Sequence, residues 1–167
     1  MTEYIDSIER AAHIIRAGGL VAFPTETVFG IGADATNSDA VKRLFAAKGR
    51  PGNNPLIVHL DDAAHWSRAA SDLSDVARVM LDCFSPGPLT VVLPKKETIS
   101  ELVTAGLETV GVRVPAHPIA REILRSAAVP VAAPSANQSG RPSGTTWKAV
   151  AEDLDGRIDA IFTADSS

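Results

Sequence analysis

The first apolar pattern along the chain predicts a helix followed by a buried strand. Between residues 7 and 16 apolar side chains recur at spacings of three and four, the period of one helix face; they are Ile8, Ala11, Ala12 and Ile15. Two glycines at positions 18 and 19 end this pattern. Residues 20–23 then form a short apolar run closed by Pro24, which predicts a strand that leads into a turn.

Helical spacing recurs in four later segments. One helix is predicted to begin at a capping residue, Ser38 or Asp39, and to end at the helix-breaking sequence Gly-Arg-Pro-Gly at 49–52. The other three cover residues 73–84, 117–126 and 145–154.

The helix predicted over residues 73–84 carries the only cysteine. Its apolar positions are expected to face inward; they are Val76, Val79, Met80 and Cys83. We therefore expect Cys83 to be a buried, inert thiol. A single cysteine also excludes an internal disulfide and a cysteine-rich zinc site.

The remaining apolar runs predict strands that alternate with these helices. They cover residues 56–60, 89–93, 109–114, 129–133 and 158–163. Such alternation favours an α/β fold with helices covering a sheet, and the adjacent strands between residues 89 and 114 indicate an antiparallel portion. The sequence thus predicts a mixed sheet, and 167 residues are enough for one domain.

Composition narrows the classes of function. Sixteen Lys and Arg residues against twenty Asp and Glu residues give a formal net charge of −4, which argues against strong sequence-independent binding of nucleic acid. The longest apolar runs, 20–24 and 89–94, are far shorter than the roughly 20 residues of a membrane-spanning helix. The first ten residues are polar and acidic, unlike a secretory signal, so we expect a cytoplasmic protein.

Four irregular segments carry polar residues at the ends of predicted strands or helices, where α/β folds usually bind ligands. They are PTETVFG (24–30), KGRPGNNP (48–55), VGVRVP (110–115) and APSANQSGRPSG (133–144). Each segment alone is equally consistent with ordinary turn chemistry.

The segment 48–55 suits an anion such as a triphosphate. It places the cations Lys48 and Arg50 and two asparagine amides on a glycine-rich loop. The alternative is the solvated end of a helix, where Lys and Arg are common. The phosphate-binding motif GxxxxGK[ST] does not occur in the sequence.

Arg113 and His59 are polar residues within apolar strands. An unpaired guanidinium inside a valine-rich strand would be costly, so Arg113 needs a carboxylate partner: Glu108, Glu26 or a bound ligand. His59 ends the run LIVHL, and a lone histidine there is more typical of a satisfied core residue than of a ligand contact.

The other histidines lie on helix-like surfaces without a metal-ligand spacing; they are His13, His65 and His117. No metal site built by the protein is therefore predicted. The segment 133–144 has small hydroxyl and amide side chains that could form hydrogen bonds to a ribose, base or phosphate. The alternative is that they stabilise an Asx or Ser turn. No activated nucleophile is recognisable, so any catalysis is expected to work by positioning.

Taken together and in order, five segments resemble the signature of the YrdC-like family of L-threonylcarbamoyl-adenylate synthases. They are PTETVFG, KGRPGNNPLIVH, PGPLT, VGVRVP and APSANQSGRPS, and the match spans about residues 18–143. The resemblance implies a twisted mixed α/β sheet, flanked by helices, around a deep cavity that binds ATP and L-threonine.

The resemblance also implies a reaction of three substrates. The amine of threonine takes up bicarbonate or carbon dioxide as a carbamate, which attacks the α-phosphate of ATP and releases pyrophosphate. The product, threonylcarbamoyl-adenylate, feeds a threonylcarbamoyl-transferase machinery that modifies an adenosine beside the anticodon of certain tRNAs.

Site residues are implied position by position. The threonine contacts would be Thr27, His59, Arg113 and the backbone of Ala133. The triphosphate contacts would be Lys48, Arg50 and Asn54, and the nucleotide contacts Thr109, Ser135, Asn137 and Ser143. Catalysis would rest on Lys48, Arg50 and a Mg²⁺ ion carried with ATP, without a covalent nucleophile.

The sequence departs from the family pattern in two ways. Phe29 stands where many members have tyrosine, which removes a hydroxyl from the cavity wall. Members usually continue with a further strand that carries a Ser-Thr pair, and longer members have a second domain. The expectation is therefore one YrdC-like domain over residues 1–167 that lacks the family's last strands.

Two other functions remain open at this stage. Some YrdC-like proteins are thought to bind RNA through a basic concave surface, which makes an RNA- or ribosome-binding module without synthase activity the main alternative. The other is a sister domain that handles a carbamoyl-adenylate for a different acceptor, as in hydrogenase maturation proteins.

Overall fold

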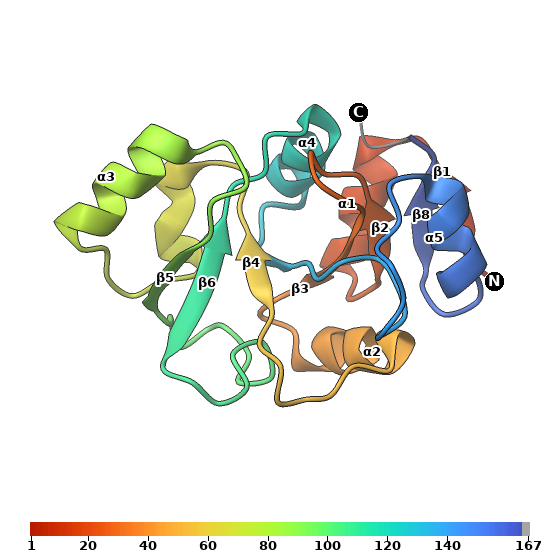
Figure 1. Cartoon of the computed structure of the whole chain (residues 1–167), viewed down its shortest axis with the longest axis horizontal. Coiled ribbons are helices and arrows are strands. Elements are labelled where there is room, and N and C mark those ends of the chain that lie inside the picture. The colour runs from red at the N-terminus through yellow and green to blue at the C-terminus, as the bar shows by residue number, and fades with distance from the viewer. Residues whose placement is uncertain (165–167) are drawn as a thin grey trace.

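A computed structural model describes residues 1–164 (Figure 1); residues 165–167, the end of the predicted domain, lie outside the described residues. An eight-stranded sheet runs in the order β1-β8-β2-β3-β7-β4-β6-β5. The strands are β1 (Glu3–Ile5), β2 (Val21–Phe23), β3 (Gly30–Asp34), β4 (Ile57–His59), β5 (Val91–Pro94), β6 (Thr109–Arg113), β7 (Val131–Ala132) and β8 (Ala160–Phe162). The helices are α1 (Ile8–Arg16), α2 (Ser38–Lys48), the 3₁₀ helix η1 (Ala63–Arg68), α3 (Asp75–Phe84), α4 (Pro118–Ala127) and α5 (Trp147–Leu154).

The sheet is mixed, as predicted. Strand pairs β1/β8, β2/β8 and β4/β6 are parallel, whereas β2/β3, β3/β7, β4/β7 and β5/β6 are antiparallel. The antiparallel portion expected between residues 89 and 114 is the pair β5/β6, in which Val91 lies opposite Val112. The predicted fold class is confirmed.

Two apolar clusters form because side chains alternate between the faces of the sheet. In β2, Phe23 belongs to the cluster that α1 and α4 cover, whereas Ala22 belongs to the larger cluster that α2 covers. Figure 1 shows α4 and α2 on opposite sides of the central strands. Both sides of the sheet are therefore buried.

Most predicted elements are present, with bounds that differ by a few residues. The predicted N-terminal cap of α2, Ser38 or Asp39, is wrong. The cap is Asn37, whose side-chain oxygen accepts hydrogen bonds from the N–H groups of Asp39 and Ala40, both at 3.1 Å. An extended residue whose side chain reaches the first free N–H groups is the usual helix cap.

The sequence did not predict β1, β3 or η1. Strand β3 was not predicted because two of its five residues, Gly30 and Gly32, are glycines, which are poor strand formers. The fold requires a glycine at position 32, since a Cβ atom there would lie 2.6 Å from the ring of Phe23. The aromatic ring thus packs directly on the backbone of the neighbouring strand.

The inward face predicted for the helix over residues 73–84 is wrong. The buried residues of α3 are Ala77 and Leu81, whereas Val76 is 75% exposed, Val79 59% and Met80 37%. Cys83 is exposed as well, so the predicted burial of its thiol is also wrong. These side chains are exposed because α3 packs beside β5, the last strand of the sheet, and its outer side faces solvent (Figure 1).

His117 also departs from expectation, because it is buried and caps α4. Its Nδ1 atom accepts a hydrogen bond of 3.2 Å from the N–H of Ile119. An imidazole can serve as a helix cap where a neutral ring nitrogen is available as acceptor.

The true buried face of α3 can be tested by paired substitutions. Leu81→Ala should lower the free energy of unfolding by about 3 kcal/mol, because it removes buried methyl groups and leaves a cavity. Val79→Thr should change it by less than about 0.5 kcal/mol, because that side chain is exposed. Urea unfolding followed by circular dichroism measures both, and equal effects would contradict this orientation of the helix.

Candidate active site

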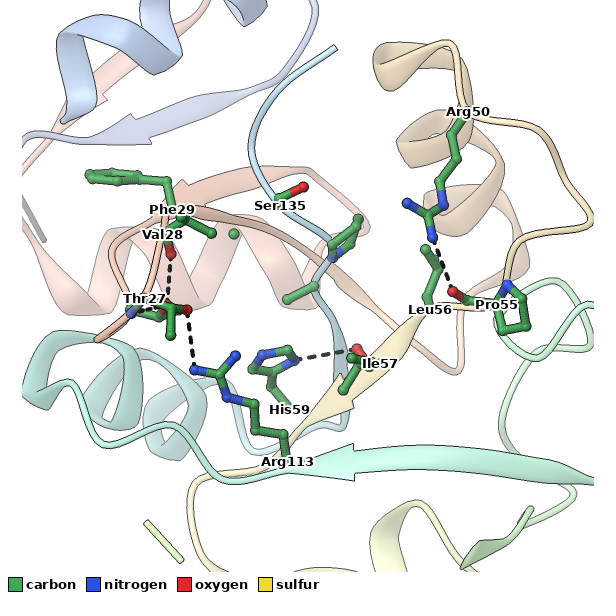
Figure 2. Close-up of a pocket in the computed structure, with 14 residues that line it drawn as sticks. Thr27, Val28, Phe29, Arg50, Pro55, Leu56, Ile57, His59, Arg113 and Ser135 are labelled. Carbon is green, nitrogen blue, oxygen red and sulfur yellow. Dashed lines mark hydrogen bonds between the residues drawn. The ribbon is translucent and has the colours of Figure 1, made fainter. Parts of the chain in front are cut away.

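The four irregular segments predicted to bind ligands meet at one cavity of about 290 Å³ (Figure 2). Its wall combines the turn after β2, the loop after α2, the ends of β4 and β6, and the chain that leaves β7. The lining residues are Thr25, Thr27, Val28, Phe29, Gly30, Arg50, Pro55, Leu56, Ile57, His59, Arg113, Ala133, Pro134 and Ser135.

Backbone pairing explains why distant segments converge here. In the parallel pair β4/β6, His59 lies opposite Arg113, and β7 on the other side of β4 places Val131 opposite His59. The chain after β7 then pairs with the start of β3: Ile31 N–H donates to the carbonyl of Pro134 at 2.9 Å, and Ala136 N–H donates to that of Phe29 at 2.7 Å.

Thr25 shapes the turn that carries Thr27. The buried Thr25 hydroxyl donates to the carbonyl of Val28 at 2.6 Å and accepts from the N–H of Thr27 at 3.2 Å. These bonds form a local turn of the kind that Ser and Thr side chains stabilise. The hydroxyl of Thr27 consequently points toward Arg113 (Figure 2). The sequence indicated Thr27 as a site residue but gave no sign of the structural role of Thr25.

Arg113 has an internal carboxylate partner, and it is Glu26 rather than Glu108. Its Nη2 atom donates to Oε1 of Glu26 at 2.6 Å and to the hydroxyl of Thr27 at 3.3 Å. Burial raises the pKa of Glu26, but the hydrogen bond and charge of Arg113, together with the N–H groups of Glu26 and Ala116, outweigh it. The pKa of Glu26 stays below its ordinary value, so its carboxylate is ionised at neutral pH.

His59 is a buried, neutral imidazole beside Arg113. Burial, followed by the positive charge of Arg113, lowers the pKa of His59 to about 4. Its Nδ1 atom lies 3.3 Å from the carbonyl oxygen of Ile57, and because that oxygen only accepts, Nδ1 carries the proton. Nε2 is left as an acceptor, so His59 both satisfies a backbone carbonyl and lines the cavity.

Lys48 is not the solvated helix end that the sequence allowed. Its side chain is buried, and Nζ donates to the carbonyl oxygens of Ser135 and, at 2.7 Å, Asn137. Burial, followed by the charge of Arg50, lowers the pKa of Lys48 to about 8. Lys48 lies outside the lining of the cavity and holds the chain at residues 135–137 from behind.

Arg50 is the cation of this loop that lines the cavity. Gly49 ends α2 in the left-handed conformation, with φ of 60°, and turns the chain so that Arg50 faces Pro55. The guanidinium donates to the carbonyl oxygens of Pro55 at 3.1 Å and Asn54 at 3.4 Å. The side chain of Asn54 is exposed and lies outside the cavity lining.

Asn137 and Ser143 bond to each other instead of lining the cavity. The amide of Asn137 donates to the carbonyls of Gln138 and Arg141, both at 2.8 Å, and its Oδ1 accepts from the hydroxyl of Ser143 at 3.1 Å. Thr109 is exposed at the start of β6, four residues before Arg113. Of the predicted nucleotide contacts, the structure therefore brings Ser135 to the cavity.

The cavity wall also has an apolar part that the sequence did not single out. Val28, Pro55, Leu56 and Ile57 line it, and their only sequence signal was their position between polar candidates. Phe29, which the sequence placed in the cavity wall, is fully buried, and its ring points away from the polar groups of the cavity (Figure 2). Apolar walls with a few convergent polar groups are typical of small-molecule sites.

The polar groups divide the cavity into two ends (Figure 2). A guanidinium, a neutral imidazole and a hydroxyl lie together at one end, from Arg113, His59 and Thr27, and Arg50 lies apart from them. The first end suits a small ligand with a carboxylate and a hydroxyl or amine, and the second suits an anion. Within residues 1–164 no group of three or more His, Cys, Asp and Glu side chains could hold a metal ion.

None of the helices in the described part of the chain is long and apolar enough to span a membrane.

Comparison with known proteins gives one family. The sequence profile of the Sua5, YciO and YrdC family, described as telomere recombination, matches residues 13–167. A Bacillus subtilis protein named threonylcarbamoyl-AMP synthase is 50% identical over 92% of this chain, and a Pyrococcus abyssi protein of the same name is 51% identical over 93%. The chain spans about half the length of these relatives, 45% and 46%.

A solved structure is similar to nearly the whole chain. The crystal structure of P. abyssi Sua5 complexed with L-threonine has a TM-score of 0.93 and 46% sequence identity. The match covers 99% of this chain and 50% of the other.

The burial of Lys48 predicts a pH dependence of stability. Its pKa falls from 10.5 to about 8 on folding, so the unfolded chain binds this proton more tightly between those values. Stability rises with pH wherever the unfolded state binds more protons. The free energy of unfolding of the wild type, relative to Lys48→Met, should therefore increase from pH 8 to pH 10.

Urea unfolding of both proteins at pH 7.5, 9 and 10 measures this difference, since all other titrating groups are shared. If the difference in the free energy of unfolding stays constant from pH 7.5 to pH 10, the folded protein keeps Lys48 protonated, and the two carbonyl oxygens stabilise its charge over that range.

Proposed function

The chain belongs to the Sua5, YciO and YrdC family, and we propose that its cavity forms L-threonylcarbamoyl-adenylate and pyrophosphate from ATP, L-threonine and bicarbonate or carbon dioxide. The observation that carries this proposal is the grouping of Arg113, His59 and Thr27 at one end of the cavity, apart from Arg50. The names of the B. subtilis and P. abyssi relatives support the same reaction.

In this proposal threonine binds at the Arg113 end. Arg113 would hold the carboxylate through N–H groups that Glu26 does not use, since a guanidinium has five donors. The neutral Nε2 of His59 and the hydroxyl of Thr27 are suited to the hydroxyl and amine of the ligand. The backbone of Ala133 would complete the contacts, because it lies in the wall beside them.

The nucleotide would bind from Arg50 toward Ser135. Arg50 faces the cavity and would contact the triphosphate directly, with Asn54 in the same loop. Lys48 would add positive potential and would keep the carbonyls of Ser135 and Asn137 in place. We retain Thr109, Asn137 and Ser143 as proposed nucleotide contacts; the last two would have to exchange the hydrogen bond that they now share.

The chemistry asks for positioning and charge neutralisation. The amine of threonine and bicarbonate give a carbamate and water; a carbamate oxygen then forms a bond to the α-phosphorus as the bond to pyrophosphate breaks. Arg50, Lys48 and a Mg²⁺ ion that arrives on ATP would neutralise the developing charge, and the cavity would align the reactants. No covalent intermediate on the protein is required.

We propose a cytoplasmic role in tRNA modification, with the product passing to a threonylcarbamoyl-transferase machinery. An RNA-binding role without synthase activity is less well supported, because the net charge is −4 and two of the cavity's cations are already engaged with a carboxylate or backbone carbonyls.

The function is tested by measuring pyrophosphate release from ATP and bicarbonate. We expect release to require threonine and to be slower with serine. Release that threonine does not stimulate, together with an RNA affinity that survives Arg50→Ala and Arg113→Ala, would replace the synthase with the RNA-binding alternative.

The role of Arg113 gives a second prediction. Arg113→Ala should raise the threonine concentration for half-maximal rate by at least about tenfold, while that for ATP changes by less than about twofold, because the lost contact is to the threonine carboxylate. Arg125→Ala, an exposed arginine in the last turn of α4, is the matched control. Equal losses for both substrates would indicate that Arg113 is structural.

A further inference from the structure

Glu26 binds Arg113 but is not among the residues that line the cavity. Arg113 lines the cavity and Glu26 does not, although their side chains are joined at 2.6 Å. The two side chains are only 13% and 22% exposed. The carboxylate therefore binds the guanidinium without forming part of the cavity lining.

Two atoms of this pair have no hydrogen-bond partner among residues 1–164. They are Oε2 of Glu26 and Nε of Arg113, and both are buried. A guanidinium and a carboxylate can form two parallel bonds, one through Nη2 and one through Nε. In the structure the bond through Nη2 is formed and the one through Nε is not; pairing the two orphan atoms as well would satisfy both and leave Nη1 for a ligand.

The turn fixes the position of the carboxylate. Glu26 stands between Thr25, whose hydroxyl closes the turn onto Val28, and Thr27, whose hydroxyl also accepts from Nη2 of Arg113. Two neighbouring residues of one turn thus bind the same nitrogen atom. Rotation of the guanidinium would break both bonds.

Charge also restricts what can bind. Glu26 and Arg113 together are neutral, and His59 beside them is neutral at pH 7. A carboxylate that binds Arg113 adds a negative charge to a largely buried place, unless the ligand brings a positive charge of its own. A zwitterionic amino acid does this, whereas a simple carboxylic acid does not.

We propose that Glu26 is the positioning residue of this site: it holds Arg113 so that the free side of the guanidinium faces the cavity, and it makes the site selective for zwitterionic amino acids. The identity of the ligand rests on the proposed function. The orientation of Arg113 does not depend on it.

The first test needs no ligand. The Nη2–H signals of Arg113, which donates to Glu26 and Thr27 through this atom, should be protected from solvent exchange in a ¹⁵N NMR spectrum of the wild type and of Glu108→Ala, whose exposed carboxylate was the other candidate partner. They should exchange rapidly in Glu26→Ala. Unchanged protection in Glu26→Ala would overturn the positioning role, whatever the protein binds.

The second test uses threonine and its analogue without the amine, 3-hydroxybutyrate, as calorimetric probes. We expect Glu26→Ala to weaken threonine binding about tenfold, with the affinity for ATP within about twofold. Discrimination against 3-hydroxybutyrate should shrink in the same variant, because the uncompensated guanidinium then accepts a plain anion.

Glu26→Gln keeps the size of the side chain and serves if Glu26→Ala does not fold; it should lose the discrimination as well. The double variant with Arg113→Ala should bind threonine no more weakly than Arg113→Ala alone, since Glu26 acts through Arg113. Additive losses, or equal losses for threonine and ATP, would assign Glu26 to stability instead. Wild-type protein that binds no threonine would overturn the proposed function.

Discussion

The parallel register of β4 and β6 is the constraint on which the site depends. It sets His59 opposite Arg113, while the preceding pair, Val58 and Val112, points into the core on the other face. A slip of one residue would turn His59 to the core and a valine to the cavity, because side chains alternate along a strand. The buried valines therefore fix the position of the polar pair.

Burial of charge follows from that register and explains the other contacts. A guanidinium beside a buried imidazole needs a partner, and the turn after β2 provides it through Glu26 and Thr27. Lys48 meets the same requirement with backbone carbonyls. Arg113 and Lys48 thus each join two segments far apart in the sequence, so these two charges also hold the walls of the cavity together.

The sequence predicts those features of the fold and site that rest on several patterns together. The mixed sheet could be predicted from the alternation of apolar runs, and the shared cavity of the four polar segments could be expected from their resemblance to one family. Strand β3 could not, since Gly32 is set by contact with Phe23. The outer face of α3 was misassigned because apolar residues lie on both sides of that helix. Whether Arg113 pairs with Glu26 or Glu108 depends on tertiary structure alone.

The segment after β7 shows why a cluster of polar residues overstates the number of ligand contacts. Both polar atoms of the Asn137 side chain form hydrogen bonds within residues 137–143. Lys48 in addition donates to the backbone carbonyls of Ser135 and Asn137. The loop first has to satisfy its own backbone, and Ser135 is what it then presents to the cavity. A wall whose shape is largely set before a ligand arrives would suit the proposed attack on the α-phosphate, which depends on alignment; among the proposed nucleotide contacts, only Asn137 and Ser143 would first have to give up a hydrogen bond that they share.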